Sequence, residues 1–507
     1  MSSRARKPHT LAAVLVLSAS VSSAAEHTTA TSPSSSSPPT EPATHARSFV
    51  TTHTGLFGGT SITYVATAAD AFLTDAHAAA TARVFSFTYV RQGVKDIASR
   101  PVLFIFNGGP GSASLWIHMG VLGPRRIAPD DAAHPTTVAP FRVVDNPLSP
   151  LDIADLVFID PVGTGFSQVV GNGKPEEFYG VNEDARATVD FIIDWLTRNR
   201  RWGSPKYVLG ESYGTTRAAV LAKALEGGPY GGGILPAVSL NGVVLLGVSI
   251  GSPGSDASYQ LLLPSLAATA WYHGKVEKNG RTFETFLSAV RQFAGTEYGA
   301  ALFAGNLVPQ AQQQAVAARL ATFTGLSQTF VLDHHLRISS TDFASEVLRD
   351  RGLDVGSYDG RYTLRHDGSG SDPVADDPAM AQYTASYVAT FNDYLQRDLG
   401  ITLEQRYEPI SFGAVNAHWN WGPGSPSQPR ADELATAMRR NPSMRLLVGS
   451  GYYDLVTPFA QAQYMINHAA IPPGRVTFKN YESGHMVYLG EQGAAAFASD
   501  LREFLHP

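Results

Sequence analysis

The feature that most constrains the fold of this chain is a series of short apolar segments separated by longer stretches of helical periodicity. Several of the short segments are apolar at every position, which is typical of parallel strands covered on both faces. The longer stretches, such as residues 183–200 and 494–505, repeat apolar side chains at helical spacing. This alternation predicts an α/β fold with a mostly parallel central sheet flanked by helices. The expected strands lie at residues 84–90, 102–106, 156–159, 206–209, 243–246 and 445–448.

One long stretch, residues 251–410, interrupts this alternation. It is rich in Ala, Gln and Phe, shows helical periodicity and lacks a series of buried strands. An independent domain here would leave the strand and helix over 445–507 without a sheet to join. We therefore expect a mostly helical insertion, or cap, between two parts of one core, residues 48–250 and residues 411–507.

The first residues have the pattern of an export signal. A basic start over 4–7, an apolar run over 11–17 and small residues at 23–25 predict a signal peptide over residues 1–25. The apolar run is too short to span a bilayer, so we expect a secreted or periplasmic protein with no membrane anchor after cleavage. Residues 26–47 are rich in Ser, Thr and Pro and are expected to form a disordered spacer.

Composition excludes several classes of function. The chain is 44% hydrophobic and 16% charged, which is typical of a globular protein with a sizeable core. Its formal net charge is −6 even with the basic start over 4–7, and no basic run follows, so nucleic acid and anionic lipid are not expected as partners. The chain has no Cys, which excludes disulfides, thiolate metal sites and cysteine catalysis.

The strongest candidate nucleophile is Ser212. It is the central residue of a G-x-S-x-G motif that follows the expected strand 206–209 and precedes a helix-forming run, which is the strand–turn–helix context of a nucleophile elbow. Residues 247–251 match the same motif around Ser249, but Ser-Pro-Gly follows and cannot open a helix at once. The alternative for Ser212 is a buried structural serine.

Two further residues complete a catalytic triad in the order that α/β-hydrolases use, which is Ser, acid, then His. Asp454 follows the expected strand 445–448, and His485 lies in a loop before the final helix. Because the carboxyl ends of parallel strands gather at one edge of a sheet, we expect the three side chains to meet there. His485 would act as the base, and Asp454 would orient its imidazole.

A glycine-rich turn follows another expected strand. Residues 107–111 read Asn-Gly-Gly-Pro-Gly, and such a turn can direct backbone N–H groups at a developing oxyanion. The alternative is a plain tight turn.

Taken together, these motifs resemble the serine carboxypeptidase family of the α/β-hydrolase superfamily. The resemblance covers about residues 90–507 and is to a bacterial-type secreted member without cysteines. It implies an α/β-hydrolase fold, no metal or cofactor, and release of C-terminal amino acids from peptides through an acyl-enzyme on Ser212. The motifs that carry the resemblance lie at residues 107–111, 160–167, 210–214 and 484–487.

The resemblance also implies roles for residues around Ser212. The oxyanion donors would be the backbone N–H groups of Gly109 and Tyr213. Asn107 and Glu211 would hydrogen-bond the free α-carboxylate of a peptide substrate, which makes the enzyme an exopeptidase.

The sequence departs from the family pattern at several positions. Ser112 stands where the family has a Cys, Ile105 where it has a Trp, and Tyr452 where the triad loop has a first Asp. Val121 stands where a second carboxylate-binding Glu is expected, so the carboxylate site is only half present.

These departures leave alternatives open. Arg125 or Arg126, in the same loop as Val121, is an alternative partner for the substrate carboxylate. An esterase or acyltransferase on the same scaffold is the second hypothesis. A non-catalytic binding protein is a remote third, because no triad residue is lost. Side-chain preference and oligomeric state are open.

Overall fold

The computed structural model of the chain describes residues 45–129, 131, 135–228, 237–368, 372–422 and 428–506. The predicted signal peptide, residues 1–25, lies outside the described residues, and so does nearly all of the predicted spacer, residues 26–47. Arg47, the last residue of that spacer, forms an ion pair with Asp70, with Nε 2.7 Å from Oδ2. The chain is therefore anchored to the sheet from this point on.

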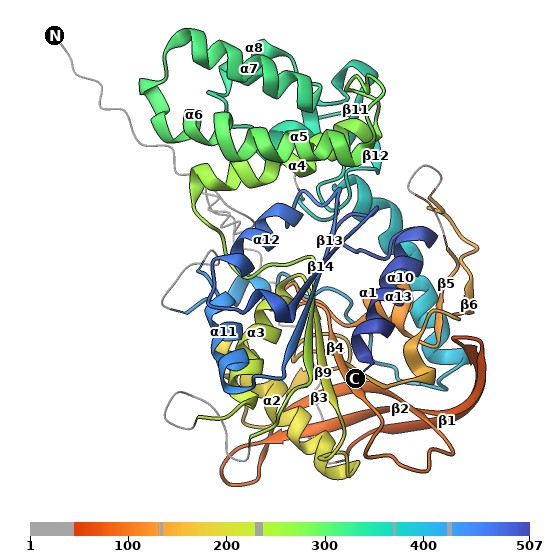
Figure 1. The fold of residues 1–507 in the computed structure, drawn as a ribbon. Coiled ribbons are helices and arrows are strands. Elements are labelled where there is room, and N and C mark those ends of the chain that lie inside the picture. Colours follow the sequence, from red (N-terminus) through yellow and green to blue (C-terminus); the bar gives the residue numbers. More distant parts are fainter. Residues whose placement is uncertain are drawn as a thin grey trace, which may run out of the picture.

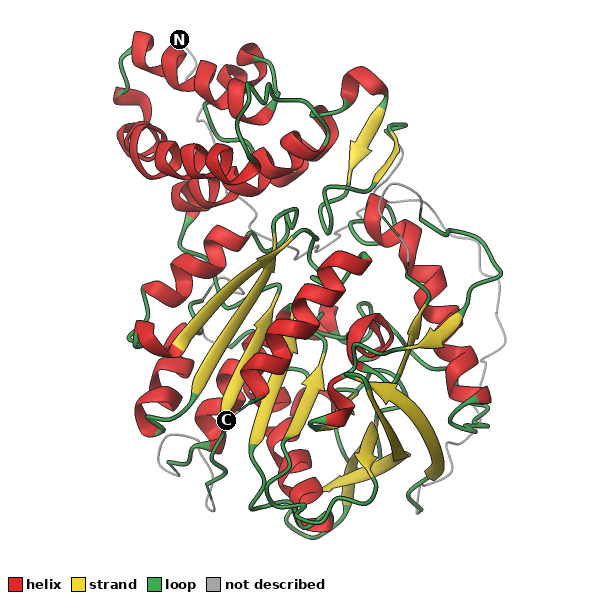
Figure 2. Cartoon of the chain, turned by 45° about the vertical axis from the view of Figure 1, so that its right-hand side comes forward, coloured by secondary structure: helices red, strands yellow, loops and turns green. Residues whose placement is uncertain are grey.

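A single large sheet runs through the molecule (Figures 1 and 2). Its strand order is β1-β2-β3-β7-β4-β9-β10-β13-β14, and β8 pairs with β3. The strands from β7 to β14 are all parallel, whereas β1, β2 and β3 form an antiparallel edge. The predicted mostly parallel sheet is confirmed. The strands are β1 (Ser48–Phe57), β2 (Thr60–Thr74), β3 (Ala80–Arg91), β4 (Val102–Phe106), β7 (Asp155–Ile159), β8 (Gln168–Val169), β9 (Lys206–Glu211), β10 (Gly242–Leu246), β13 (Arg445–Gly451) and β14 (Val476–Tyr481).

Helices cover both faces of this sheet (Figure 2), which explains why its central strands are apolar at every position. In β4, Leu103 and Ile105 enter one hydrophobic cluster, while Val102, Phe104 and Phe106 enter the other. The first cluster includes residues of α1 (Leu115–Ile117), the π-helix η1 (His118–Leu122), α10 (Pro378–Arg397) and α13 (Glu491–Leu505). The second includes residues of α2 (Val181–Arg198), α3 (Tyr213–Leu225), α11 (Ala431–Arg440) and α12 (Phe459–Asn467).

A helical lobe stands above the carboxyl ends of the strands (Figure 1). Its helices surround a third hydrophobic cluster of their own. They are α4 (Ser255–Tyr272), α5 (Phe283–Phe293), α6 (Gly299–Ala304), α7 (Gln310–Thr324), α8 (Gln328–Asp333) and α9 (Ser340–Glu346). Within the predicted insertion, residues 251–410, α10 instead packs in the first cluster through Tyr383, Tyr387 and Phe391. The insertion therefore contributes to both the lobe and the main core.

Two small antiparallel sheets lie apart from the large one. They pair β5 (Arg125–Ile127) with β6 (Val143–Asp145), and β11 (Leu353–Val355) with β12 (Thr363–Arg365). Across the ranges that the structure describes, no helix is both long and apolar enough to cross a bilayer.

Candidate active site

Ser212 lies on a sharp turn between β9 and α3. Its backbone has φ 59° and ψ −130°, a left-handed conformation that is strained for a residue with a side chain. Strand β9 ends at Glu211, and α3 begins at Tyr213, so the strained residue is the only one between strand and helix. This is the geometry that exposes a nucleophile at the end of a strand.

Ser249 lies in a different environment. It follows β10 in a loop, and α4 begins only at Ser255. Its N–H donates to the Thr215 hydroxyl at 2.8 Å, so its backbone is tied to α3. The second G-x-S-x-G match therefore forms no strand–turn–helix unit.

Asp454 and His485 are brought together from the loops after β13 and β14. The Oδ2 atom of Asp454 lies 2.9 Å from Nδ1 of His485, and both side chains are buried. The Thr457 hydroxyl donates to the same Oδ2 and lies 3.0 Å from Nδ1. The other oxygen, Oδ1, accepts from the N–H groups of Val456 and Thr457. Asp454 is thus fixed as an acceptor for a proton on Nδ1, which leaves Nε2 to act as a base.

The electrostatics of His485 follow from this pairing. Burial by itself would lower the pKa of the imidazole, but the charge and hydrogen bond of Asp454 outweigh burial, and Glu211 adds to their effect. The pKa of His485 is therefore raised above its ordinary value. A raised pKa makes it a stronger base but also means that activity is lost as the pH falls.

Ser212 and His485 both contact the backbone at the end of β10. The Ser212 N–H donates to the carbonyl of Leu246 at 2.9 Å, and the next residue is Gly247. A Cβ on Gly247 would lie 2.9 Å from Nδ1 and Cε1 of His485, so the imidazole packs directly on this glycine. The Nε2 atom of His485 is buried and has no hydrogen-bond partner within the described ranges. It makes no hydrogen bond to the Ser212 hydroxyl in this structure, so the pairing of Ser212 with His485 stays a prediction.

The loop that carries His485 is held by the segment 357–361, which follows the helical lobe. The His485 N–H donates to the carbonyl of Tyr358 at 2.6 Å, and the Gly484 N–H donates to Oδ2 of Asp359 at 3.0 Å. Arg361 pairs with Asp359 and donates to the carbonyl of Glu482 at 2.7 Å. The loop 357–361, which leads back from the helical lobe, therefore fixes the position of His485.

The glycine-rich turn after β4 lies against the nucleophile. A Cβ on Gly108 would lie 2.4 Å from the backbone N of Tyr213 and 2.7 Å from the carbonyl O of Glu211, so only glycine fits here. The neighbouring residue Gly109 has φ 102°. The predicted oxyanion donors, the N–H groups of Gly109 and Tyr213, thus come from two backbone segments in close contact.

Asn107 and Glu211 form a buried pair beside Ser212. The Asn107 amide donates to Oε1 of Glu211 at 2.6 Å, and the Tyr488 hydroxyl donates to the same oxygen at 3.2 Å. The other oxygen, Oε2, is buried with no hydrogen-bond partner in the described part of the chain. Burial raises the pKa of Glu211 to about 7, although His485, Tyr488 and Asn107 each act to lower it. A protonated Glu211 could donate from Oε2 to a carboxylate.

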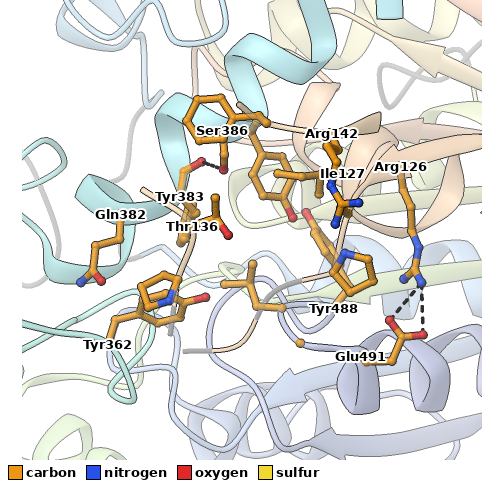
Figure 3. Close-up of a pocket in the computed structure, with 18 of the residues that line it drawn as sticks. Arg126, Ile127, Thr136, Arg142, Tyr362, Gln382, Tyr383, Ser386, Tyr488 and Glu491 are labelled. Atoms are coloured by element: carbon orange, nitrogen blue, oxygen red, sulfur yellow. Dashed lines mark hydrogen bonds and ion pairs between the residues drawn. The ribbon is translucent and has the colours of Figure 1, made fainter. Parts of the chain in front are cut away.

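The residues around Val121 separate into different environments. Val121 itself is fully buried in the first hydrophobic cluster. Arg125 pairs with Asp145, and Arg126 donates to Oε2 of Glu491 at 2.9 Å. Arg126 and Glu491 line a cavity together with Tyr383 and Tyr488 (Figure 3). The structure shows no contact between either arginine and Glu211.

Sequence reasoning missed several residues that support the site. Thr457 could have been found from its position three residues after Asp454, where an Asp side chain often accepts from the following turn. Arg217 is fully buried and donates to the carbonyl of Asn107 at 2.7 Å and to Asp184 at 2.7 Å, but no local motif marks it. Tyr488 follows the predicted His485 motif by one residue, without a signal for its contact with Glu211.

No group of three or more His, Asp or Glu side chains that could hold a metal ion is found among the residues that the structure describes.

Comparisons with known proteins show the family of this chain. Serine carboxypeptidase-like 36 of Arabidopsis thaliana is 31% identical over 180 residues, which is 35% of this chain and 33% of that protein. Carboxypeptidase Y of Saccharomyces cerevisiae is 29% identical over 128 residues, which is 25% of this chain and 22% of that protein. The aligned segment thus spans about a third or less of each relative.

The structure is similar to the crystal structure of KEX1(delta)p, a prohormone-processing carboxypeptidase from Saccharomyces cerevisiae. The TM-score is 0.55 at 14% identity, and the match covers 87% of this chain and 91% of that chain. At this identity the likeness shows a shared fold, and the predicted α/β-hydrolase fold is confirmed.

A family model also matches most of the chain. The serine carboxypeptidase model, Peptidase_S10, matches residues 73–495, which include every predicted site residue from Asn107 to His485. The chain therefore belongs to the serine carboxypeptidase family.

Proposed function

We propose that this protein is a secreted serine carboxypeptidase that releases C-terminal amino acids from peptides through an acyl-enzyme on Ser212. Its family, the position of Ser212 and the Asp454–His485 pair support serine hydrolase chemistry. Secretion is proposed from the signal pattern of residues 1–25.

The reaction would proceed in two halves. Ser212 Oγ attacks the carbonyl carbon of the last peptide bond, and Nε2 of His485 takes the hydroxyl proton. The N–H groups of Gly109 and Tyr213 stabilise the oxyanion. The C–N bond then breaks, the proton passes to the leaving amine, and the acyl group stays on Ser212. Water, which loses a proton to His485, attacks the acyl ester and regenerates the serine.

The observation that carries the exopeptidase assignment is the buried Asn107–Glu211 pair adjoining Ser212. A charged Glu211 would repel a substrate carboxylate, but a protonated Glu211 can donate a hydrogen bond to it. Burial already favours the protonated form up to about neutral pH, since the pKa of Glu211 is about 7. The pair is therefore suited to a free C-terminal carboxylate, to which a protonated Glu211 donates a charge-assisted hydrogen bond.

The test compares an N-blocked dipeptide with its own C-terminal amide at pH 5. A carboxypeptidase cleaves the free acid with a much lower KM than the amide. Equal KM values for the two substrates would exclude carboxylate recognition. An inactive Ser212→Ala variant serves as the control for contaminating peptidases.

The second candidate is an esterase or acyltransferase on the same scaffold. One observation favours it: Val121, where the family has a second carboxylate-binding acid, is fully buried among apolar side chains. An enzyme of this kind would turn over blocked esters efficiently and show no preference for a free carboxylate.

A further inference from the structure

Glu211 is held asymmetrically. Both donors within hydrogen-bond distance, the Asn107 amide and the Tyr488 hydroxyl, reach the same oxygen, Oε1. A carboxyl oxygen that faces two donors uses its lone pairs as an acceptor, so when Glu211 is protonated the proton lies on the other oxygen. The proton is therefore directed to Oε2, which is buried and has no partner within the described ranges.

Tyr488 lies next to Val121, the position where the family pattern has a second carboxylate-binding Glu. Its ring packs on the backbone of Gly120, the residue before Val121, because a Cβ on Gly120 would lie 2.3 Å from Cε2 of Tyr488. The same Cβ would lie 3.1 Å from the Tyr387 hydroxyl. A buried aromatic residue thus fills the region next to position 121, and its hydroxyl reaches Glu211.

We infer that Tyr488 substitutes for the second Glu of the carboxylate site, which is absent at position 121. It is a positioning residue: its hydroxyl orients Glu211 so that Oε2 presents the proton to the substrate carboxylate. A neutral hydroxyl can do this without adding another negative charge near the substrate. The inference rests on the proposed carboxypeptidase function and names the residue that sets its substrate recognition.

The titratable groups that act on Glu211 give this role a pH signature. His485 and the hydrogen bonds of Tyr488 and Asn107 favour the charged form, whereas burial and Asp454 favour the protonated form. Tyr387 also lies within range of the Glu211 charge. Removing the Tyr488 hydroxyl takes away one donor to the carboxylate, so the pKa of Glu211 should rise.

The test is Tyr488→Phe, with Tyr383→Phe as the matched control. Both substitutions delete one buried hydroxyl, but the Tyr383 hydroxyl contacts Sδ of Met380 at 2.7 Å rather than Glu211. The KM for an N-blocked dipeptide is measured from pH 5 to pH 9, together with kcat/KM for a blocked ester without a carboxylate.

Two changes are expected for Tyr488→Phe. At pH 5 the KM for the dipeptide rises roughly 2- to 10-fold, which corresponds to one lost hydrogen bond. The pH at which this KM begins to climb moves upward relative to wild type. The kcat/KM for the blocked ester stays within about twofold of wild type, because this substrate has no free carboxylate for Glu211 to bind. Tyr383→Phe should alter none of these values.

A second variant tests the same contact from the other side. Gly120→Ala forces the Tyr488 ring away from its position and should reproduce the loss of peptide affinity with the ester constants retained. Wild-type KM values and pH dependence in both Tyr488→Phe and Gly120→Ala would overturn the inference while leaving the carboxypeptidase function in place. A wild-type enzyme with equal KM for the free acid and the amide would overturn both.

Discussion

Glu211→Gln is the substitution that separates carboxylate recognition from the chemistry of the triad. Glutamine has the shape of a protonated glutamic acid: its carbonyl can accept from Asn107 and Tyr488, and its amide can donate where Oε2 carries a proton. The variant should therefore bind peptides as the protonated wild type does, but at every pH.

The size of the effect follows from the raised pKa of Glu211, which is about 7. Nearly all of the carboxyl is protonated at pH 5, and about a tenth of it at pH 8. Because only the protonated form is competent, the KM for a free-carboxylate peptide should rise about tenfold over this range in wild type. In Glu211→Gln the same KM should change by less than about twofold.

The assay is a set of initial rates for an N-blocked dipeptide at several pH values, analysed for KM and kcat separately. The separation matters because kcat also falls at acidic pH, where His485 becomes protonated in both proteins. A parallel rise of KM in wild type and variant would refute the assignment of Glu211 as the carboxylate anchor. The esterase reading would then be preferred.

The same substitution has a consequence for stability. The pKa of Glu211 in the folded chain lies above its ordinary 4.5, so the wild-type fold loses stability as the pH rises from there through about 7. Glutamine does not titrate and escapes this loss, which approaches about 3 kcal/mol in unfolding free energy. Thermal unfolding should show the advantage of Glu211→Gln growing from pH 5 to pH 8; an advantage independent of pH would contradict the buried, protonated state.

Three further substitutions test other parts of the site. Ser212→Ala should abolish turnover with an unchanged melting temperature, and a fluorophosphonate should label Ser212 in wild type; an adduct on Ser249 would refute the assignment. Gly108→Ala places a Cβ 2.4 Å from the backbone N of Tyr213 and should lower kcat about 100-fold on peptides and esters alike, whereas a loss confined to peptides would exclude an oxyanion role. Thr457→Val removes a donor to the triad carboxylate and should lower kcat roughly 2- to 10-fold at constant KM; unchanged kcat would show that the hydroxyl is dispensable.

The central sheet was the most predictable part of the fold, for a physical reason. The expected strand at residues 102–106 coincides with β4, because each of its residues enters one of two hydrophobic clusters and must be apolar. Strands with one exposed face carry a weaker signal. In β2 buried and partly exposed positions alternate, but Asp70 is buried and Val65 is partly exposed, so polarity does not follow burial. The partly exposed edge strand β14 has no apolar run, and neither strand was expected.

Helix α10 shows a different limit of prediction from sequence. Its apolar residues repeat at helical spacing, as expected within the insertion, but periodicity reveals only that a helix has an apolar face. It does not reveal which core that face joins. In the structure Tyr387 and Phe391 pack in the main core rather than in the helical lobe.

The active site likewise has features that the sequence predicts and contacts that it does not. The strained serine, the glycine-rich turn and the order of the triad residues are properties of short segments, and the sequence motifs carry them. The contacts that tune the site join distant segments: Tyr488 and Glu211 are 277 residues apart, and Asp359 and Gly484 are 125 apart. Such pairs depend on the packing of the whole fold, and no local pattern encodes them.

The most direct measurement of the central claim is mass spectrometry of a synthetic peptide incubated with the purified protein at pH 5. The proposed function predicts a ladder of products shortened one residue at a time from the C-terminus. The same peptide with a C-terminal amide should be cleaved far more slowly, and Ser212→Ala should produce no ladder from either. Internal cleavage, or equal shortening of the acid and the amide, would contradict the claim that this chain is a carboxypeptidase.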